Sequence, residues 1–260
     1  MFFGYSDEEK MLQKSVRDML KERNSTENVR GFMEDPVIST DLQKLLAQQG
    51  LLGIIDLESK EEKGIVNAII VSQEAGRSLL TYPLLESMVG LAVLKESKQQ
   101  AQLVEDLELG KKILTVAWVN TDAKARKTEE GYVINGTLRE VPFAEDADVI
   151  IANVRISGYG VTAEEEETLV SIDGKNQAVT KLNSQSVDET YPLYEINLAN
   201  YPLQEGHLIG RAGMGSGKEK MEKMRQLGSL LLAAEIVGCS ERTLYETVEY
   251  TKQREQFGTV

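Results

Sequence analysis

Cysteine and histidine are almost absent from this 260-residue chain, which has one of each, Cys239 and His207. A lone cysteine cannot form an internal disulfide, so a reducing compartment is expected. One cysteine and one histidine would also leave a zinc site dependent on carboxylates, and a histidine-based catalytic triad with a single candidate. We therefore predict no metal site, and we expect any chemistry to come from a carboxylate or a cofactor.

Long apolar runs and excess positive charge are missing as well. No stretch approaches the roughly 18 apolar residues of a membrane span, and none is predicted. The opening MFFGYSDEEK lacks the basic segment and apolar stretch of a secretory signal, so a cytoplasmic location is expected. The net charge is −13 and the cations are interleaved with anions, so nucleic acid is not an expected partner.

The first 110 residues have the apolar spacing of helices. Ser6 and Glu9 form a capping box ahead of Leu12, Val16, Met19 and Leu20, which recur at helical spacing. A second helix is expected from Asp41 to a stop at Gly50. Three further helices are predicted in the segments 64–79, 85–97 and 98–110. The sequence thus predicts an all-helical domain over residues 1–110.

The pattern changes near residue 111. The segments 112–119, 131–141, 147–156, 168–173 and 191–198 are rich in β-branched and aromatic residues, and Asn135-Gly136 indicates a hairpin turn. After the glycine-rich segment the helical period returns and continues to about Phe257; about 38 residues at 1.5 Å each predict a rod of about 55 Å. The predicted fold is α+β and multidomain: a helical domain (1–110), an antiparallel β-barrel-like domain (111–215), and one long helix of an incomplete bundle (216–260).

Two motifs allow more than one interpretation. The glycine-rich segment GRAGMGSGK fails the phosphate-loop pattern, because Ala212 stands where the first glycine belongs and Glu219 follows Lys218. A hinge leading into the long helix is the favoured interpretation. Trp118 ends an apolar strand, and composition alone leaves open whether it is core or one wall of a flat cofactor site. The chain's last segment, REQFG, is either an ordinary helix end or an anion-binding motif.

Resemblance to a known family bears on both alternatives. FGYSDEEKMLQKSVRDML, LLAQQGLLGI, SQEAGRSLLTYPL and GYVINGTLREVPFAEDADVIIA resemble segments of the acyl-CoA dehydrogenase family. The long segment LLLAAEIVGCSERTLYETVEYTKQREQFG resembles the family's long helix, which ends in Arg-x-Gln-Phe-Gly. The resemblance spans the whole chain, which is short at its C-terminal end relative to the family pattern. It implies a helical domain, a β domain and a C-terminal helical bundle.

The resemblance also implies FAD as the cofactor. It assigns the FAD pyrophosphate of a neighbouring subunit to Arg254, and the adenine half to Gln256 and Phe257. A guanidinium can bind a phosphate through two hydrogen bonds. It assigns the flavin region to Trp118 and Val119, at the end of the TVAWV strand, and to Val141 and Pro142.

Three features depart from the family pattern. The glycine-containing flavin loop is replaced by Asn120-Thr121-Asp122 followed by AKARKTEE. At the start of the long helix, where some members place their catalytic glutamate beside an arginine, this chain has Gly228 and Ser229; Arg225 lies one turn earlier. Neither Gly228 nor Ser229 can take a proton from a carbon, so no catalytic residue is assigned. The helices that would cover the apolar stripe of the long helix are not in this sequence.

Two functions follow from the resemblance. The first is FAD-dependent α,β-dehydrogenation of acyl-CoA thioesters, with an electron-transferring flavoprotein as the implied electron acceptor. The second is a non-catalytic subunit or scaffold of a heteromeric acyl-CoA dehydrogenase. Both imply association with other chains, as a homo-oligomer or as a heteromer with a complete subunit.

Overall fold

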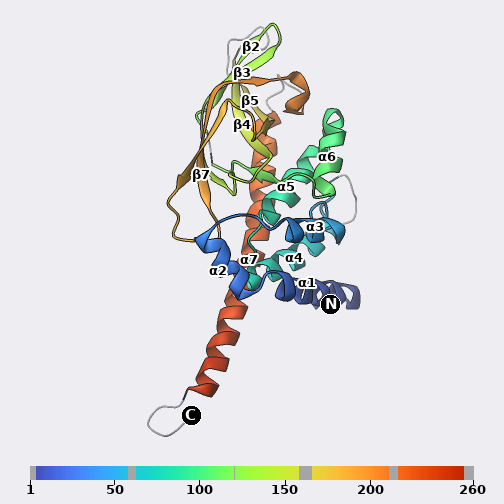
Figure 1. Ribbon diagram of the computed structural model, residues 1–260. Helices are drawn as coiled ribbons and strands as arrows, with labels where there is room; N and C mark the ends of the chain where they lie inside the picture. The colour runs from blue at the N-terminus through green and yellow to red at the C-terminus, as the bar shows by residue number, and fades with distance from the viewer. Residues whose placement is uncertain (1–3, 58–62, 120, 158–165, 211–215, 255–260) are drawn as a thin grey trace.

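A computed structural model of the chain describes residues 4–57, 63–119, 121–157, 166–210 and 216–254. Figure 1 shows a group of helices beside a β-sheet, with one long helix, α7, that passes both and then extends beyond them. This arrangement confirms the α+β prediction and the order of a helical part, a β part and a long helix. The domain boundaries at residues 110 and 215 stay predictions.

The first three N-terminal helices begin at serine caps, Ser6, Ser25 and Ser39. Ser6 accepts from the Glu9 N–H, and the Glu9 carboxylate accepts from the Ser6 N–H, which confirms the capping box. The helix that begins after Ser25 was not predicted, because its nine residues bury only Val29 and Phe32. The helices of this part are α1 (Asp7–Arg23), α2 (Thr26–Glu34), α3 (Thr40–Gln48), α4 (Lys63–Ser78), α5 (Leu84–Leu94), the short 3₁₀ helix η1 (Lys98–Gln100) and α6 (Ala101–Glu108).

The β part is one eight-stranded sheet in the order β6-β7-β3-β2-β4-β5-β8, with β1 paired to β4. Most pairings are antiparallel, as predicted, but β4 pairs in parallel with both β1 and β2. β1 and β2 pair with the two ends of β4, at residues 149–151 and 155–157, while β5 pairs along its other edge. The strands are β1 (Leu114–Val116), β2 (Lys124–Thr128), β3 (Gly131–Pro142), β4 (Val149–Ser157), β5 (Glu166–Asp173), β6 (Val179–Ser184), β7 (Leu193–Leu203) and β8 (Leu208–Ile209).

The hairpin predicted at Asn135-Gly136 is wrong. Both residues lie inside β3, where the pairing to β7 shifts register between Ile134 and Gly136. Gly136 has φ +132°, and a Cβ there would stand 2.6 Å from the Cα of Ala123. The glycine therefore makes a bulge against a neighbouring backbone, and the tight turn between β2 and β3 lies instead between Thr128 and Gly131.

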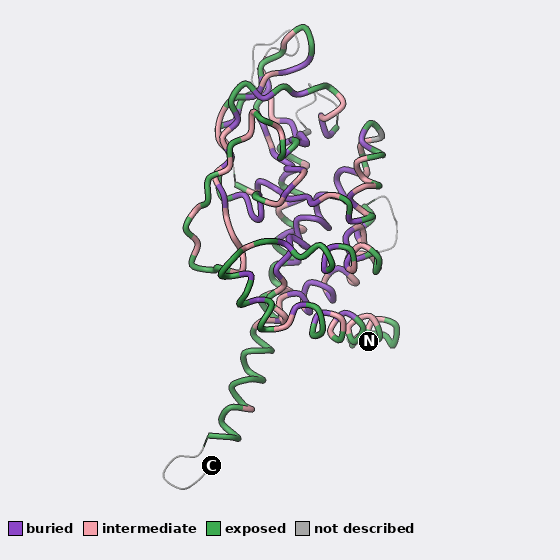
Figure 2. Tube along the Cα trace, viewed as in Figure 1, coloured by how far each residue is buried: buried purple, intermediate pink, exposed green. Residues whose placement is uncertain are grey.

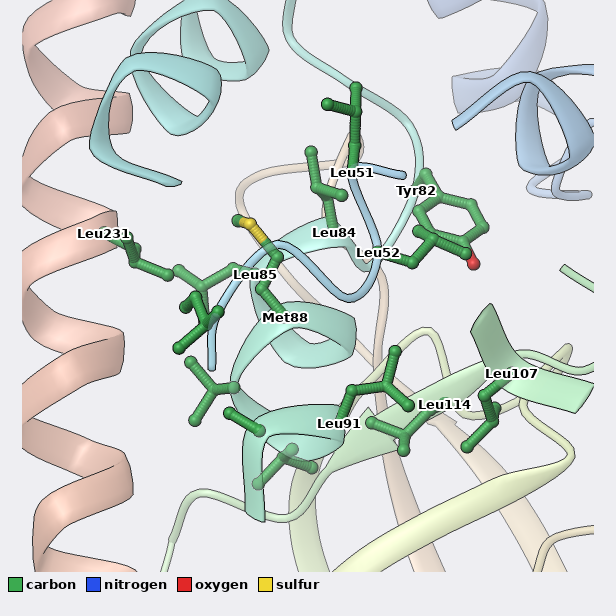
Figure 3. Packing of buried hydrophobic residues seen from close by; sticks show 14 of the residues in the cluster. Leu51, Leu52, Tyr82, Leu84, Leu85, Met88, Leu91, Leu107, Leu114 and Leu231 are labelled. Atoms are coloured by element: carbon green, nitrogen blue, oxygen red, sulfur yellow. The ribbon is translucent and has the colours of Figure 1, made fainter. Parts of the chain in front are cut away.

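Helix α7 (Ser216–Gln253) has 38 residues. It packs most extensively on α4, at a crossing where a Cβ on Gly238 would stand 1.8 Å from the carbonyl oxygen of Gln73. Figure 3 shows Leu231 of α7 directed at the buried cluster that contains Met88 and Leu114. Small residues thus let two helix backbones approach closely, and this contact fixes α7 against the helical part.

Beyond the crossing, α7 projects from the rest of the chain with its surface exposed (Figure 2). Along α7, exposed apolar residues at seven- and four-residue spacing lie on one side and define what we call the α7 apolar face: Leu230, Val237, Leu244 and Val248. An exposed apolar stripe of this kind is a candidate interaction surface. Among the described residues, no helix is both long enough and apolar enough to cross a membrane.

Candidate functional site

Trp118 lies where the end of β1 meets helices α5 and α7. Its indole Nε1 donates a hydrogen bond of 3.1 Å to Oε1 of Glu86, on α5. Its ring lies against Gly228 of α7, where a Cβ would stand 3.0 Å from the Trp118 ring. Trp118 is half-buried and packs on the core cluster. The core interpretation therefore holds for most of the ring, and a cofactor could contact only its remaining surface.

Arg225 joins the same corner from α7. Its Nε donates a 3.0 Å hydrogen bond to the carbonyl oxygen of Trp118. The arginine thus holds the strand end against the long helix. Gly228 and Ser229 follow one turn later, at the positions where some family members place a glutamate base. Gly228 is buried under the tryptophan ring and Ser229 is exposed, so neither supplies a base.

The other residues predicted at the flavin lie close by in the β part. Val119 is 40% exposed, so its side chain is available to a ligand. Val141 is fully buried in the hydrophobic core of the β part. Pro142 is also buried, and its carbonyl oxygen accepts a 2.6 Å hydrogen bond from Oγ1 of Thr115. The structure therefore leaves Val119 and part of Trp118 as the exposed members of this predicted set.

Whether these residues fit FAD depends on charge as well as on shape. An aromatic ring and an aliphatic side chain suit one face of a flat isoalloxazine. The nearby charged groups do not suit a pyrophosphate. Arg225 is bonded to the Trp118 carbonyl oxygen, and Arg139 is 3.6 Å from Asp122. Glu140, beside Arg139, is acidic and exposed. The fit is therefore incomplete without a cation from elsewhere.

Arg254 is such a cation, but it lies at the far end of α7. Its guanidinium carbon stands 5.5 Å from the ring centroid of Tyr250, and the side chain is exposed. Because Trp118 contacts Gly228, the 26 residues from there to Arg254 place it about 39 Å away along the helix. One chain therefore does not bring the two together. Gln256 and Phe257, the other predicted members, lie outside the described residues.

The sequence interpretation missed a group of acids and phenols beside Trp118. Glu86 is 1% exposed, and its Oε1 accepts hydrogen bonds from Trp118 and from the hydroxyl of Tyr191. Burial raises the pKa of Glu86, and its two hydrogen bonds oppose that shift. Glu235 of α7 lines the same cavity as Glu86 and Tyr191. One signal was present: Glu86 is the single charged residue in the apolar segment LLESMVGLAVL.

No family model matches the chain. Among curated proteins, it is 26% identical over 259 residues to "Acyl-CoA dehydrogenase IpdE2" of Mycobacterium tuberculosis, covering 97% of this chain and 66% of that protein. The chain therefore spans about two thirds of the length of this relative.

Solved structures match the described fold closely. A glutaryl-coenzyme A dehydrogenase in complex with glutaryl-CoA superposes with a TM-score of 0.86 at 19% identity, covering 100% of this chain and 70% of that one. The ChsE4–ChsE5 complex of Mycobacterium tuberculosis gives 0.83 at 20% identity, with the same coverage. A Mycobacterium smegmatis glutaryl-CoA dehydrogenase with FADH2 gives 0.80 at 16% identity and covers 98% of this chain and 68% of that one.

The fold of the chain is the fold of these solved structures. Sequence relatives and solved structures agree in identifying the acyl-CoA dehydrogenase family, which confirms the resemblance seen in the sequence.

Proposed function

We propose that the chain is a subunit of an acyl-CoA dehydrogenase assembly and that it shares its FAD site with a second chain. The observation that carries this proposal is the separation along α7: the Trp118 corner lies near one end, and Arg254 lies about 39 Å away at the other. A second chain whose α7 packs on the first can bring its own Arg254 to the first chain's Trp118.

The α7 apolar face supports this association. Burial of apolar surface contributes about 25 cal/mol per Å², so the face is stabilised when another chain covers it. The related ChsE4–ChsE5 structure is itself a complex of two different chains. Both a homo-oligomer and a heteromer with a complete subunit satisfy the argument, and we propose an assembly of this kind in the cytoplasm.

Within such an assembly, the residues of this chain have defined tasks. Val119 and the exposed part of Trp118 offer one wall for a flat ring, and Arg254 supplies positive charge for the pyrophosphate. Bound FAD would supply the capacity to accept electrons from an acyl-CoA. An electron-transferring flavoprotein remains the proposed acceptor.

A second candidate function has its own observation. Gly228 lies under Trp118 and Ser229 is exposed, so neither of the two positions where the family resemblance would place a base carries a carboxylate. This favours a non-catalytic subunit, paired with a chain that supplies the base. If this chain alone turns over an acyl-CoA with an artificial electron acceptor, the non-catalytic role is ruled out.

The shared site can be tested by mixing two variants. Arg254→Gln removes the guanidinium, and Val119→Glu puts a carboxylate beside the proposed ring site; each alone should bind FAD at least tenfold more weakly, by flavin fluorescence. In a mixture allowed to exchange subunits, hybrid sites with both wild-type residues should restore part of the binding.

The matched control for Arg254→Gln is Arg242→Gln, because Arg242 is also on α7 and pairs with Glu246. Its FAD affinity should equal that of the unchanged chain. Absence of FAD binding to the unchanged protein, or a mixture no better than its components, contradicts the shared site.

A further inference from the structure

A cavity of about 210 Å³ lies between α4, α5, α7 and the segment before β7. Most of its wall is apolar, formed by residues that include Leu80, Leu85, Leu232 and Ile236. Three carboxyl groups also line it, from Glu86, Glu235 and Asp188. None of the described lining residues is lysine, arginine or histidine. The cavity is therefore an apolar pocket with acidic groups and no cation of its own.

Glu86 differs from the other fully buried glutamate of the helical part. Glu74 is also 1% exposed, but it accepts hydrogen bonds of 2.8 and 2.6 Å from Nε and Nη2 of Arg17. Glu86 receives only the neutral donors of Trp118 and Tyr191, both at Oε1. Its Oε2 is buried and has no hydrogen-bond partner among the described residues. A buried carboxylate oxygen without a donor is costly, and such a group commonly serves a ligand.

Glu235 adds a second half-buried carboxyl to the same cavity. Burial raises its pKa to about 8, with the neighbouring Glu86 charge as the second cause. At neutral pH this pair of carboxyl groups therefore retains a proton, chiefly on Glu235. Asp188, exposed at the cavity wall, adds negative charge that favours entry of a cation.

The cation that suits this cavity is organic. Among the described residues, no group of three or more His, Cys, Asp or Glu could hold a metal ion. The apolar lining would instead contact a hydrocarbon body, while an ammonium group has three N–H donors for carboxylate oxygens. Neutral alcohols offer one donor and no charge.

We propose that this cavity binds a small organic ammonium ion, with the ammonium between Glu86 and Glu235 and the hydrocarbon against the leucines. On binding, the proton held by the carboxyl pair leaves to solvent and the ligand's positive charge takes its place. If the chain acts in an acyl-CoA dehydrogenase as proposed above, the substrate class is an acyl-CoA whose acyl chain ends in an amine; this step rests on the proposed function. The ammonium binding itself requires no flavin.

The test is calorimetry on the full chain without FAD, with n-butylammonium chloride, 1-butanol and sodium butyrate as probes. Butylammonium should bind at least tenfold more tightly than butanol, and butyrate should bind most weakly. Repeating the titration in buffers of different ionisation enthalpy should show that close to one proton is released per butylammonium bound at pH 7.

Variants locate the site. Glu86→Gln and Glu235→Gln should each weaken butylammonium binding at least tenfold and abolish the proton release. Glu222→Gln makes the same charge change on an exposed part of α7 and should leave the affinity within twofold. The relative affinities of butylammonium, butanol and butyrate are measured on the unchanged protein. They therefore test the ammonium site even if Glu86→Gln fails to fold.

Equal binding of butanol and butylammonium, preference for butyrate, or no binding of any probe would overturn the proposal. The outcome is separate from that of the proposed function. Loss of FAD binding with intact butylammonium binding refutes only the shared flavin site, and the reverse result refutes only the ammonium site.

Discussion

Trp118 and Gly228 are in contact: a Cβ built on the glycine would stand 3.0 Å from the Trp118 ring. This contact joins the end of β1 to the long helix and leaves no room for a side chain at position 228. It also sets the orientation in which the indole reaches Glu86. The glycine is therefore required by the tryptophan ring rather than by the helix.

Gly228→Ala should crowd this ring. A helical Gly→Ala change normally stabilises by about 1 kcal/mol, while overpacking costs about 1 to 3 kcal/mol, so we expect a net loss of about 1 kcal/mol. Trp118 is the only tryptophan, so its fluorescence emission should shift to longer wavelength as the ring moves from Glu86.

The control is Gly31→Ala in α2, where a Cβ would meet nothing within 4 Å. It should stabilise by about 1 kcal/mol and leave the emission unchanged. If Gly228→Ala stabilises the chain as much as Gly31→Ala and leaves the emission unchanged, the Trp118 ring does not require a glycine at position 228.

Gly238→Ala should disrupt the crossing of α7 and α4. The new Cβ would stand 1.8 Å from the carbonyl oxygen of Gln73, which belongs to a helix backbone and cannot rotate away. The helices must separate, and we expect the free energy of unfolding to fall by about 3 kcal/mol in urea titrations. A loss below about 1 kcal/mol would mean that the two helices slide apart without cost.

Removal of Arg17 should leave the buried Glu74 carboxylate without its cation. Arg17 is partly exposed and Glu74 is not, so Arg17→Met should cost about 2 kcal/mol, the range of a hydrogen-bonded charged pair. The comparison is Lys10→Met, which breaks the exposed pair with Asp7 and should change stability by less than about 0.5 kcal/mol. Similar urea midpoints for the two variants would contradict the expectation that the Arg17–Glu74 pair contributes more stability than the Lys10–Asp7 pair.

Stability should fall as the pH rises through the range set by Glu235. Its pKa is raised from 4.5 to about 8 by burial and by Glu86. Between these two pH values Glu235 keeps its proton in the folded chain but has lost it in the unfolded chain. The contribution of Glu235 to the free energy of unfolding is therefore complete below pH 4.5 and is lost as the pH rises to about 8.

Urea midpoints measured from pH 5 to pH 8.5 should therefore decline for the unchanged chain. Glu235→Gln should flatten the decline, while Glu222→Gln should reproduce it. Identical slopes for the unchanged chain and Glu235→Gln would mean that another carboxyl group facing the cavity, Glu86, controls the pH dependence.

Local patterns carried much of the prediction. Ser6 with Glu9 set a helix start, and the apolar spacing from Met221 to Leu231 indicated the long helix that passes the core. Such signals depend on residues a few positions apart, so they can be recognised from the sequence alone. Asn135-Gly136 shows the limit: a positive φ was predictable there, but whether it made a turn or a bulge depended on strand β7.

The sequence by itself determined the alternation of helices, strands and one long helix, because hydrophobic period and caps are local properties. It also carried the motif by which Arg254 resembles a phosphate-binding residue. Only the tertiary structure decided that Trp118 packs on Gly228, that Val141 is core, and that Glu86 and Glu235 line one cavity. These pairs are separated by up to 149 positions in the chain. Their proximity depends on how the helices and the sheet pack together, which no short segment encodes.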